Sequence, residues 1–229
     1  MMKQGFTLSE VLITLGIIGV IAALTIPSVL QNYRNRLYTA QLKKTYNQLV
    51  DAAQKVMADE HATSFYETTA GVANAEPDDD FPDGKGAYYF LNNYFKTIKT
   101  DCNDTDGDDN QCYSCYSSAY SSINGETSSL TLYSDDGYCV QTVNGAAICM
   151  VYDSSNCIWY AFIDVNGADD PNIAGRDAFT MVLNSDGTLE DWSTDSDDCG
   201  TSVSSYSHIA DYSAGCITKI IEDGWVMNY

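Results

Sequence analysis

Basic residues are scarce in this chain of 229 residues: 11 lysines and arginines stand against 32 aspartates and glutamates, for a formal net charge of −21. The shortage is greatest between residues 59 and 223, where 30 acids face five bases. Such a surface repels the phosphates of nucleic acids and of anionic lipids, which makes nucleic acid a poor partner. The five bases are Lys85, Lys96, Lys99, Arg176 and Lys219.

Histidine is also rare, since only His61 and His208 occur, and neither lies in a recognisable nucleophile or metal motif. No glycine-rich loop of the phosphate-binding kind follows a predicted strand. Paired carboxylates are so abundant that they say nothing about glycosidase chemistry. We therefore predict no catalytic residues, and a membrane-tethered hydrolase is the least favoured function.

Cysteine is absent from the first 100 residues, and all eight cysteines follow. An even number in one region predicts up to four disulfides, which persist in an oxidising compartment such as the periplasm or the cell exterior. The connectivity stays open, because eight cysteines allow 105 complete pairings, although a bond between Cys102 and Cys112 would close an acidic loop. The eight are Cys102, Cys112, Cys115, Cys139, Cys149, Cys157, Cys199 and Cys216.

Zinc binding is the alternative for Cys112 and Cys115, whose C-x-x-C spacing suits a zinc knuckle or a redox pair. The second C-x-x-C or H-x-H that a tetrahedral zinc site needs is missing from the sequence. We therefore favour disulfides.

A long apolar segment lies near the N-terminus. Residues 11–33 carry no charge, and about 20 apolar residues suffice to cross the hydrocarbon core of a bilayer as a helix. The segment is longer than the core of a secretory signal, and Glu10 directly precedes it. A carboxylate inside the membrane is costly unless a partner neutralises it. The alternative is that Glu10 has no partner and lies at the membrane edge, in the interface with water.

Residues 3–13 read KQGFTLSEVLI and resemble the processing site of type IV prepilins and of the pseudopilins of type II secretion. The resemblance implies that prepilin peptidase cleaves after Gly5, on the cytoplasmic side, and that the new N-terminus, Phe6, is methylated. It also implies that Glu10 pairs with the N-terminal amine of a neighbouring subunit. Such pairing would set the axial register of a fibre, because a wrongly placed carboxylate stays unpaired in lipid.

A single helix is predicted from Phe6 to Met57, through the membrane and beyond it. Apolar residues recur at helical spacing from Tyr38 to Val56, which predicts one stripe that packs on the following domain. Pro27 lies inside the helix, where it should kink or loosen it, and pilins also have a proline near here. We predict a leader at residues 1–5, a transmembrane helix at 6–33, a projecting helix at 34–58 and an extracytoplasmic domain at 59–229.

The charges that flank the span favour the opposite orientation. Four bases after the span outnumber Lys3 before it, and by the positive-inside rule this places the C-terminal domain in the cytoplasm. The cysteines argue against that placement, and pilin-like chains commonly carry basic residues just past the span. We therefore predict a single-pass protein of the bacterial inner membrane with a periplasmic domain. The four bases are Arg34, Arg36, Lys43 and Lys44.

The fold class predicted for the chain is α+β, with one long helix against an antiparallel sheet, which is also the pilin fold. Short β-prone runs are separated by turn signals such as Asn144-Gly145. An irregular connector with one short helix or strand at residues 86–99 precedes them. The predicted strands are residues 130–134, 138–143, 146–152, 157–163, 178–183 and 188–192, and a closing core strand begins at Cys216.

The loop that follows residue 163 is rich in oxygen ligands. Ca²⁺ takes six to eight oxygens at flexible geometry, and the loop resembles the Asp-x-Asn-Gly loop of many pseudopilin-like proteins, whose major members bind Ca²⁺. A loop of Asx turns without metal is the alternative. The acidic run at residues 101–109 is a weaker candidate, because no glycine and no closing glutamate fall at the offsets that an EF-hand requires. The predicted ligands are Asp164, Asn166, Asp169, Asp170 and Asp177, and no other cofactor is expected.

A structural subunit is the function that these patterns favour: a minor pilin of a type IV pilus or a pseudopilin of a type II secretion system. Its partners would be copies of itself or related subunits, prepilin peptidase and the assembly platform of the inner membrane. A tip adhesin is the alternative, since the tyrosines, serines and asparagines between residues 112 and 124 permit surface contacts. The sequence does not discriminate between pilus and pseudopilus.

Overall fold

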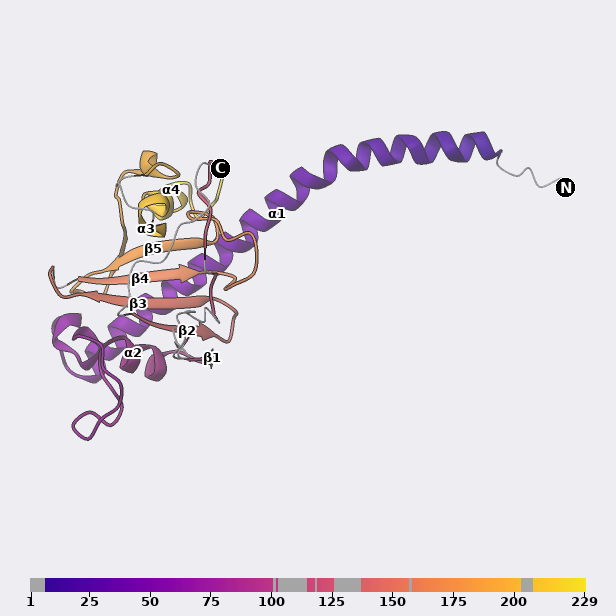
Figure 1. Cartoon of the computed structure of the whole chain (residues 1–229). Coiled ribbons are helices and arrows are strands. Elements are labelled where there is room, and N and C mark those ends of the chain that lie inside the picture. The colour runs from indigo at the N-terminus through magenta and orange to yellow at the C-terminus, as the bar shows by residue number, and fades with distance from the viewer. Residues whose placement is uncertain are drawn as a thin grey trace.

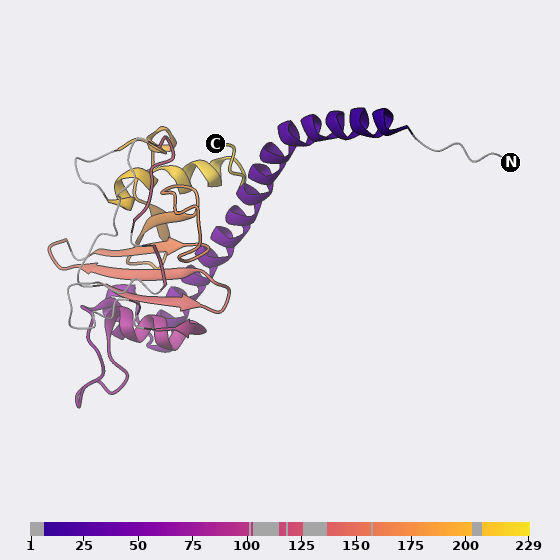
Figure 2. The same cartoon turned by 45° about the vertical axis from the view of Figure 1, so that its right-hand side comes forward.

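The computed structural model describes residues 7–100, 102, 115–117, 119–125, 137–156, 158–202 and 208–229. Helix α1 (Leu8–Asp59) has 52 residues and projects far from the rest of the molecule (Figure 1). Its length is about 78 Å at 1.5 Å per residue. The helix bends between its free half and the half that lies along the sheet (Figure 2). Pro27, the one proline inside α1, explains such a bend because it removes a hydrogen bond.

Burial divides α1 into two parts. Residues 7–34 are exposed, apart from a partly buried Ala22. From Asn35 onward one side of the helix is buried in the head, which confirms the predicted stripe. Since a fully buried leucine or valine contributes about 1.5–3 kcal/mol, this side fixes the helix to the head. The buried residues are Asn35, Tyr38, Thr39, Leu42, Thr45, Leu49, Ala52, Ala53 and Val56.

The sheet is an antiparallel meander of six strands in the order β1-β2-β3-β4-β5-β6. The five strands predicted from residue 138 onward are confirmed within one or two residues at each end. The strand predicted at residues 130–134 lies outside the described residues. The strands are β1 (Thr97–Lys99), β2 (Tyr138–Thr142), β3 (Ala147–Asp153), β4 (Ile158–Asp164), β5 (Ala178–Leu183) and β6 (Leu189–Asp191).

Both edges of the sheet are short, because β1 and β6 contain three residues each. The central strands are longer; β2 and β3 are joined by a tight turn, whereas the loop of residues 165–177 joins β4 to β5. At the β2–β3 turn, Gly145 has a φ of +90°, a conformation that favours glycine and fits the predicted hairpin.

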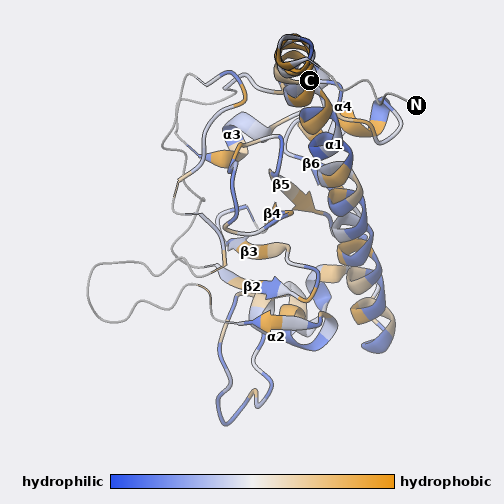
Figure 3. Cartoon of the chain, turned by 90° about the vertical axis from the view of Figure 1, so that its right-hand side faces the viewer, coloured by the Kyte–Doolittle hydropathy of each residue, from blue (hydrophilic) through white to orange (hydrophobic). Residues whose placement is uncertain are grey.

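Each face of the sheet is covered, so the strands are buried on both sides. Alternate residues of β2 to β5 point toward α1 and build the larger core, while the residues between them point to the opposite face. Seen from the side, α1 lies along one face of the sheet, and α3 and loops lie on the other (Figure 3). The second core consists of Cys102, Cys115, Tyr116, Tyr120, Cys139, Ala147, Cys149, Phe162, Ala174, Ala178 and Ile209.

Three short helices complete the head: α2 (Gly86–Tyr94), α3 (Ile209–Ser213) and α4 (Cys216–Glu222). Residues 86–99, predicted as one short helix or strand, contain one of each, since α2 leads directly into β1. The closing strand predicted from Cys216 is wrong, because this segment is α4. Its buried residues Cys216, Ile217 and Ile220 follow the helical spacing of i, i+1 and i+4, which indicates a helix and not a strand.

Candidate functional site

The described chain begins at the cap of α1, next to the predicted cleavage site. Glu10 Oε2 accepts hydrogen bonds from the backbone N–H of Thr7 at 2.8 Å and from its hydroxyl at 2.7 Å. In return, Thr7 Oγ1 accepts from the backbone N–H of Glu10 at 3.3 Å. This reciprocal arrangement is a capping box, which satisfies free donors at a helix start and is worth about 1 kcal/mol. Glu10 is thus held at the helix end, beside the residue that follows Phe6.

The assembly residues predicted from the sequence lie along this exposed half of α1. Glu10 stands in its first turn and Pro27 near its end, whereas Gly5 and Phe6 lie outside the described residues. The helix contains an apolar window long enough to cross a membrane, and none of that window is buried in the head. Leu24 is 75% exposed. Exposure of this apolar side chain to water is unfavourable, and contact with lipid or with other apolar helices would remove that cost.

A second group of predicted site residues flanks the loop between β4 and β5. Asp164 ends β4, Asp177 directly precedes β5, and both carboxyl groups are buried. Asp177 accepts from the backbone N–H of Asn172 at 2.9 Å and of Ile173 at 2.6 Å. Asp164 Oδ1 accepts from the backbone N–H of Asn166 at 3.2 Å. The two carboxyl groups therefore fix both ends of the loop.

Tyr120 is the partner of Asp164 that sequence reasoning missed. Its hydroxyl donates to Asp164 Oδ2 at 2.6 Å, and its ring packs edge-on against Phe162. Tyr120 belongs to the segment predicted as an irregular connector or an adhesive surface. No periodic pattern marks it, because the contact joins residues that are 44 positions apart.

Burial dominates the protonation of these carboxyl groups. It raises the pKa of Asp177 from 3.8 to about 6, against the opposing effect of the two backbone donors. Burial also raises the pKa of Asp164 well above its ordinary value, while the bond from Tyr120 works in the opposite direction. The negative charge of Asp177 also raises the pKa of Asp164.

Of the remaining predicted calcium ligands, Asn166 and Asp170 form side-chain hydrogen bonds within their own loop, and Asp169 is exposed. The side-chain amide of Asn166 donates to the backbone carbonyls of Asp169 and Asp170. Among the described residues, no group of three or more His, Cys, Asp or Glu is placed to hold a metal ion. The structure thus joins Asp164 to Asp177 through the loop but does not gather all five ligands, and calcium binding stays a prediction.

Three disulfides are present in the described part of the chain. They join Cys102 to Cys115, Cys139 to Cys149, and Cys199 to Cys216. The bond considered between Cys102 and Cys112 is therefore wrong, and Cys115 is not available to a zinc site with Cys112. Cys112 and Cys157 lie outside the described residues.

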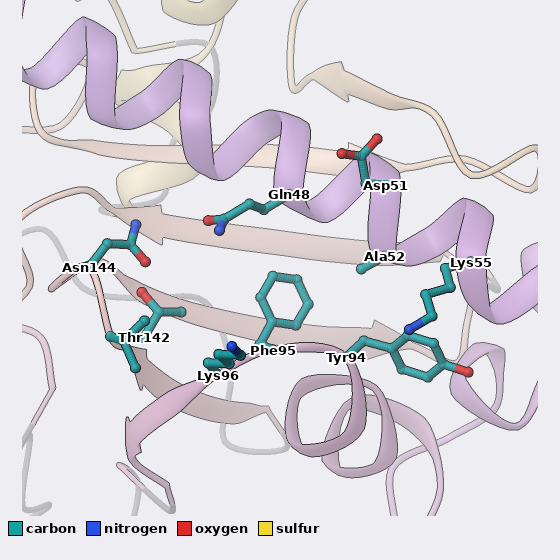
Figure 4. A pocket seen from close by; sticks show the side chains of 10 residues that line it. Gln48, Asp51, Ala52, Lys55, Tyr94, Phe95, Lys96, Thr142 and Asn144 are labelled. Atoms are coloured by element: carbon teal, nitrogen blue, oxygen red, sulfur yellow. The ribbon is translucent and has the colours of Figure 1, made fainter.

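An open crevice of about 430 Å³ lies between α1 and the β1–β2 edge of the sheet (Figure 4). Its charged residues are Asp51, Lys55 and Lys96. The ammonium group of Lys55 lies 5.5 Å from the centre of the Tyr94 ring, over its face, as Figure 4 shows. These residues do not form a nucleophile with a base, and neither histidine of the chain is part of the crevice.

Comparison with known proteins identifies the N-terminal segment. Residues 1–26 match the family model of the prokaryotic N-terminal methylation motif, the signature of the prepilin-type segment of type IV pilins and pseudopilins. No curated protein and no solved structure matches the chain. The motif, the long apolar helix and the antiparallel sheet with disulfides together define a pilin-like α+β architecture.

Proposed function

We propose that this chain, which carries the prepilin-type segment, is a minor pilin or pseudopilin of a type IV pilus or a type II secretion pseudopilus. One observation carries the proposal: the methylation motif at residues 1–26 runs directly into a helix whose apolar residues are exposed. That helix needs a membrane before assembly and equivalent helices after it. The head buries one side of the second half of the same helix and leaves the first half free to contact the membrane and, later, the helices of other subunits.

Glu10 gives the assembly step its chemistry. After cleavage behind Gly5, the amine of Phe6 would be the cation nearest to the apolar helix, and Glu10 of another subunit can accept a charge-assisted hydrogen bond from it. In the single chain, Glu10 is already bound to Thr7. Assembly therefore exchanges a local cap for an ion pair between subunits, and the gain is largest in apolar surroundings.

A periplasmic position of the head is supported by the three disulfides. Such bonds persist in oxidising compartments and are rare in the cytosol. The basic residues just past the span favour the opposite orientation, but they lie on the stretch of α1 that the head itself covers in part. Partners implied by the motif are prepilin peptidase, the assembly platform and other subunits.

Intact mass and N-terminal sequencing, with and without co-expressed prepilin peptidase, test the proposal. We expect loss of residues 1–5 and a methylated Phe6 only when the peptidase is present. A Gly5→Ala chain, which retains the same span, is the matched control and should keep its leader. A wild-type chain that keeps its leader with active peptidase, or that is cut near residue 30, would refute the proposed function.

A further inference from the structure

A pocket of about 340 Å³ lies where α1 leaves the head. Helix α1 contributes Pro27, Leu30 and Arg34 to its wall, and the β4–β5 loop contributes Pro171 and Arg176. The C-terminus of the chain lies close to the same stretch of α1 (Figure 1). We name this the neck pocket, and it is built from segments about 140 residues apart in the sequence.

The neck pocket contains two guanidinium groups, those of Arg34 and Arg176. Within the described parts of the chain, neither Arg34 nor Arg176 takes part in an ion pair. The Nε of Arg176 is buried and has no hydrogen-bond partner. A buried donor without an acceptor costs about 1–3 kcal/mol, so the neck pocket is energetically incomplete in the isolated chain. An anion with several acceptor oxygens would complete it.

Arg34 and Arg176 are positive charges on a chain that is mostly acidic. Arg176 is the one base between Lys99 and Lys219 in a chain of net charge −21, and most of the head therefore repels anions. Asp177, the neighbour of Arg176 in the chain, is buried. Asp177 is held by two backbone donors, its pKa is raised by burial, and the charge of Arg176 counteracts part of that rise.

Tyr38 also lines the neck pocket from α1. Burial raises the pKa of its hydroxyl, and the charges of Arg34 and Arg176 oppose part of that rise. The side-chain amide of Asn35 donates to the backbone oxygens of Met227 and Tyr229 at 3.3 Å each. The chain end is therefore tied to α1 at the neck. No ion pair links the terminal carboxylate to either arginine in the described residues.

The position of the neck pocket along α1 selects the kind of anion. Residues 11–33 are uncharged and Arg34 is the first charge after them. With the apolar residues in lipid, Arg34 lies at the level of the headgroups. Leu30 and Pro27 lie one and two turns lower, about 6 Å and 10 Å along the axis, at the level of the acyl chains. The neck pocket thus presents cations above and apolar side chains below.

We propose that the neck pocket binds the phosphate of an anionic phospholipid while the subunit resides in the membrane. The two guanidiniums would donate to the phosphate oxygens, the bonding mode that arginine favours, and the apolar wall would contact an acyl chain. The bound lipid would hold the head at a fixed height over the bilayer. This inference rests on the proposed function in one respect, that α1 spans a membrane.

Native mass spectrometry of the full chain in non-ionic detergent tests the proposal by titration with dioleoylphosphatidylglycerol or dioleoylphosphatidylcholine. We expect the wild type to bind the phosphatidylglycerol about thirtyfold more tightly, since two basic side chains near an anionic lipid contribute about 1 kcal/mol each. Arg34→Gln with Arg176→Gln should abolish this preference. The charge-matched control, Lys44→Gln with Lys96→Gln, changes two exposed lysines and should retain it.

Four outcomes would overturn the proposal. The wild type could bind both lipids equally, or the lysine control could lose the preference as fully as the arginine pair, which would indicate general electrostatics. Excess glycerol phosphate could displace the lipid as well as unlabelled phosphatidylglycerol does, which would indicate a site for soluble phosphate. The arginine pair could also keep its lipid preference and lose cross-linking between subunits, which would make the neck pocket a contact with a neighbouring subunit.

Folding and membrane insertion are controlled separately. Arg34 is exposed, so Arg34→Gln alone should leave the unfolding temperature unchanged and reduce the lipid preference about fivefold. All of these variants retain Gly5 and Glu10 and should be processed like the wild type. A chain that is never processed refutes the proposed function, whereas a processed chain without lipid preference refutes this inference alone.

Discussion

The hydroxyl of Tyr120 and the carboxylate of Asp164 form a buried hydrogen bond of 2.6 Å. It joins the segment over the second core to the end of β4, where the loop of the neck pocket begins. The second oxygen of Asp164 accepts from the backbone N–H of Asn166 at 3.2 Å, and the backbone N–H of Gly167 also stabilises the charged form. The pair therefore fixes the segment around Tyr120 to the face of the sheet that carries the second core.

Tyr120→Phe is expected to destabilise the head by about 1–3 kcal/mol, because it leaves the Asp164 carboxyl group buried with one donor fewer. Chemical denaturation of the full chain in detergent measures the change. Tyr46→Phe is the matched control, since the Tyr46 hydroxyl donates to the neutral backbone carbonyl of Leu189 at 3.0 Å. A Tyr120→Phe effect no larger than that of Tyr46→Phe would contradict the role assigned to this pair.

Mild acid is expected to stabilise the head. Burial raises the pKa of Asp177 and of Asp191 from 3.8 to about 6 in the folded state. A carboxyl group with a higher pKa when folded contributes stability that is complete below its unfolded pKa and is lost as the pH rises through the folded one. The unfolding temperature should therefore rise as the pH is lowered from 7 to 5.

Differential scanning fluorimetry at both pH values measures this slope. Asp177→Asn removes one of the titrating groups and should reduce the gain in the free energy of unfolding between pH 7 and pH 5 by about 1 kcal/mol. Asp153→Asn is the control, because hydrogen bonds from Asn156 and Ser155 lower the pKa of this exposed carboxylate. A higher unfolding temperature at pH 7 than at pH 5 would show that the buried carboxyl groups do not determine the pH dependence of the stability of the head.

Removal of the Cys199–Cys216 disulfide should cost about 3 kcal/mol, the value for a loop of this length in the chain-entropy model. The bond spans 17 positions and fixes the start of α4 to the segment that follows β6. Replacement of both cysteines by alanine, followed by urea denaturation, measures the loss. Replacement of Cys139 and Cys149 is the comparison, since β2 and β3 already pair these residues directly; it should cost less, and the reverse order would contradict the argument.

Glu10→Ala should permit cleavage and impair assembly. The leader residues are unchanged, so the peptidase should remove them, whereas the loss of the charge-assisted bond between subunits should reduce the sheared fibre fraction about tenfold or more. Immunoblots of membrane and fibre fractions give the measurement. Thr7→Ala is the control, because it removes the capping hydroxyl but keeps the carboxylate; equal loss in both variants would assign the defect to the helix cap.

Calcium binding by the β4–β5 loop has a direct test. The prediction from Asp164, Asn166, Asp169, Asp170 and Asp177 requires that about 1 mM Ca²⁺ raise the unfolding temperature, as for extracellular calcium modules. Mg²⁺ at the same concentration should have a smaller effect. Asp169→Asn with Asp170→Asn changes only exposed carboxylates and should abolish the shift. An unchanged unfolding temperature in the wild type would leave the loop held by its own hydrogen bonds.

Local patterns in the sequence predicted most of the fold. The stripe from Tyr38 to Val56 repeats every three to four residues, which is the geometry of one helix face, and α1 has that face buried. Gly145 and the β-prone runs on either side of it predicted a hairpin, and β2 and β3 form it. The segment at Cys216 was mistaken for a strand because its isoleucines are β-prone, although their spacing is helical.

The parts of the sites that could not be predicted depend on contacts between distant residues. Tyr120 meets Asp164 across 44 positions, and Arg34 meets Arg176 in the neck pocket across a longer gap. A single sequence contains no signal for such contacts, since they follow from the way the loops close over the sheet. The pairing of Cys102 with Cys115 could not be told from other pairings for the same reason.

The three-residue strands at both edges of the sheet affect how readily the heads aggregate when many subunits share one bilayer. Subunits that await assembly are confined to two dimensions, where collisions between heads are frequent. A long free edge would let one head extend the sheet of the next and lock the pair into an aggregate. Edges this short offer too few backbone groups for that reaction, so the heads can collide and separate while the helices below them select the productive contacts.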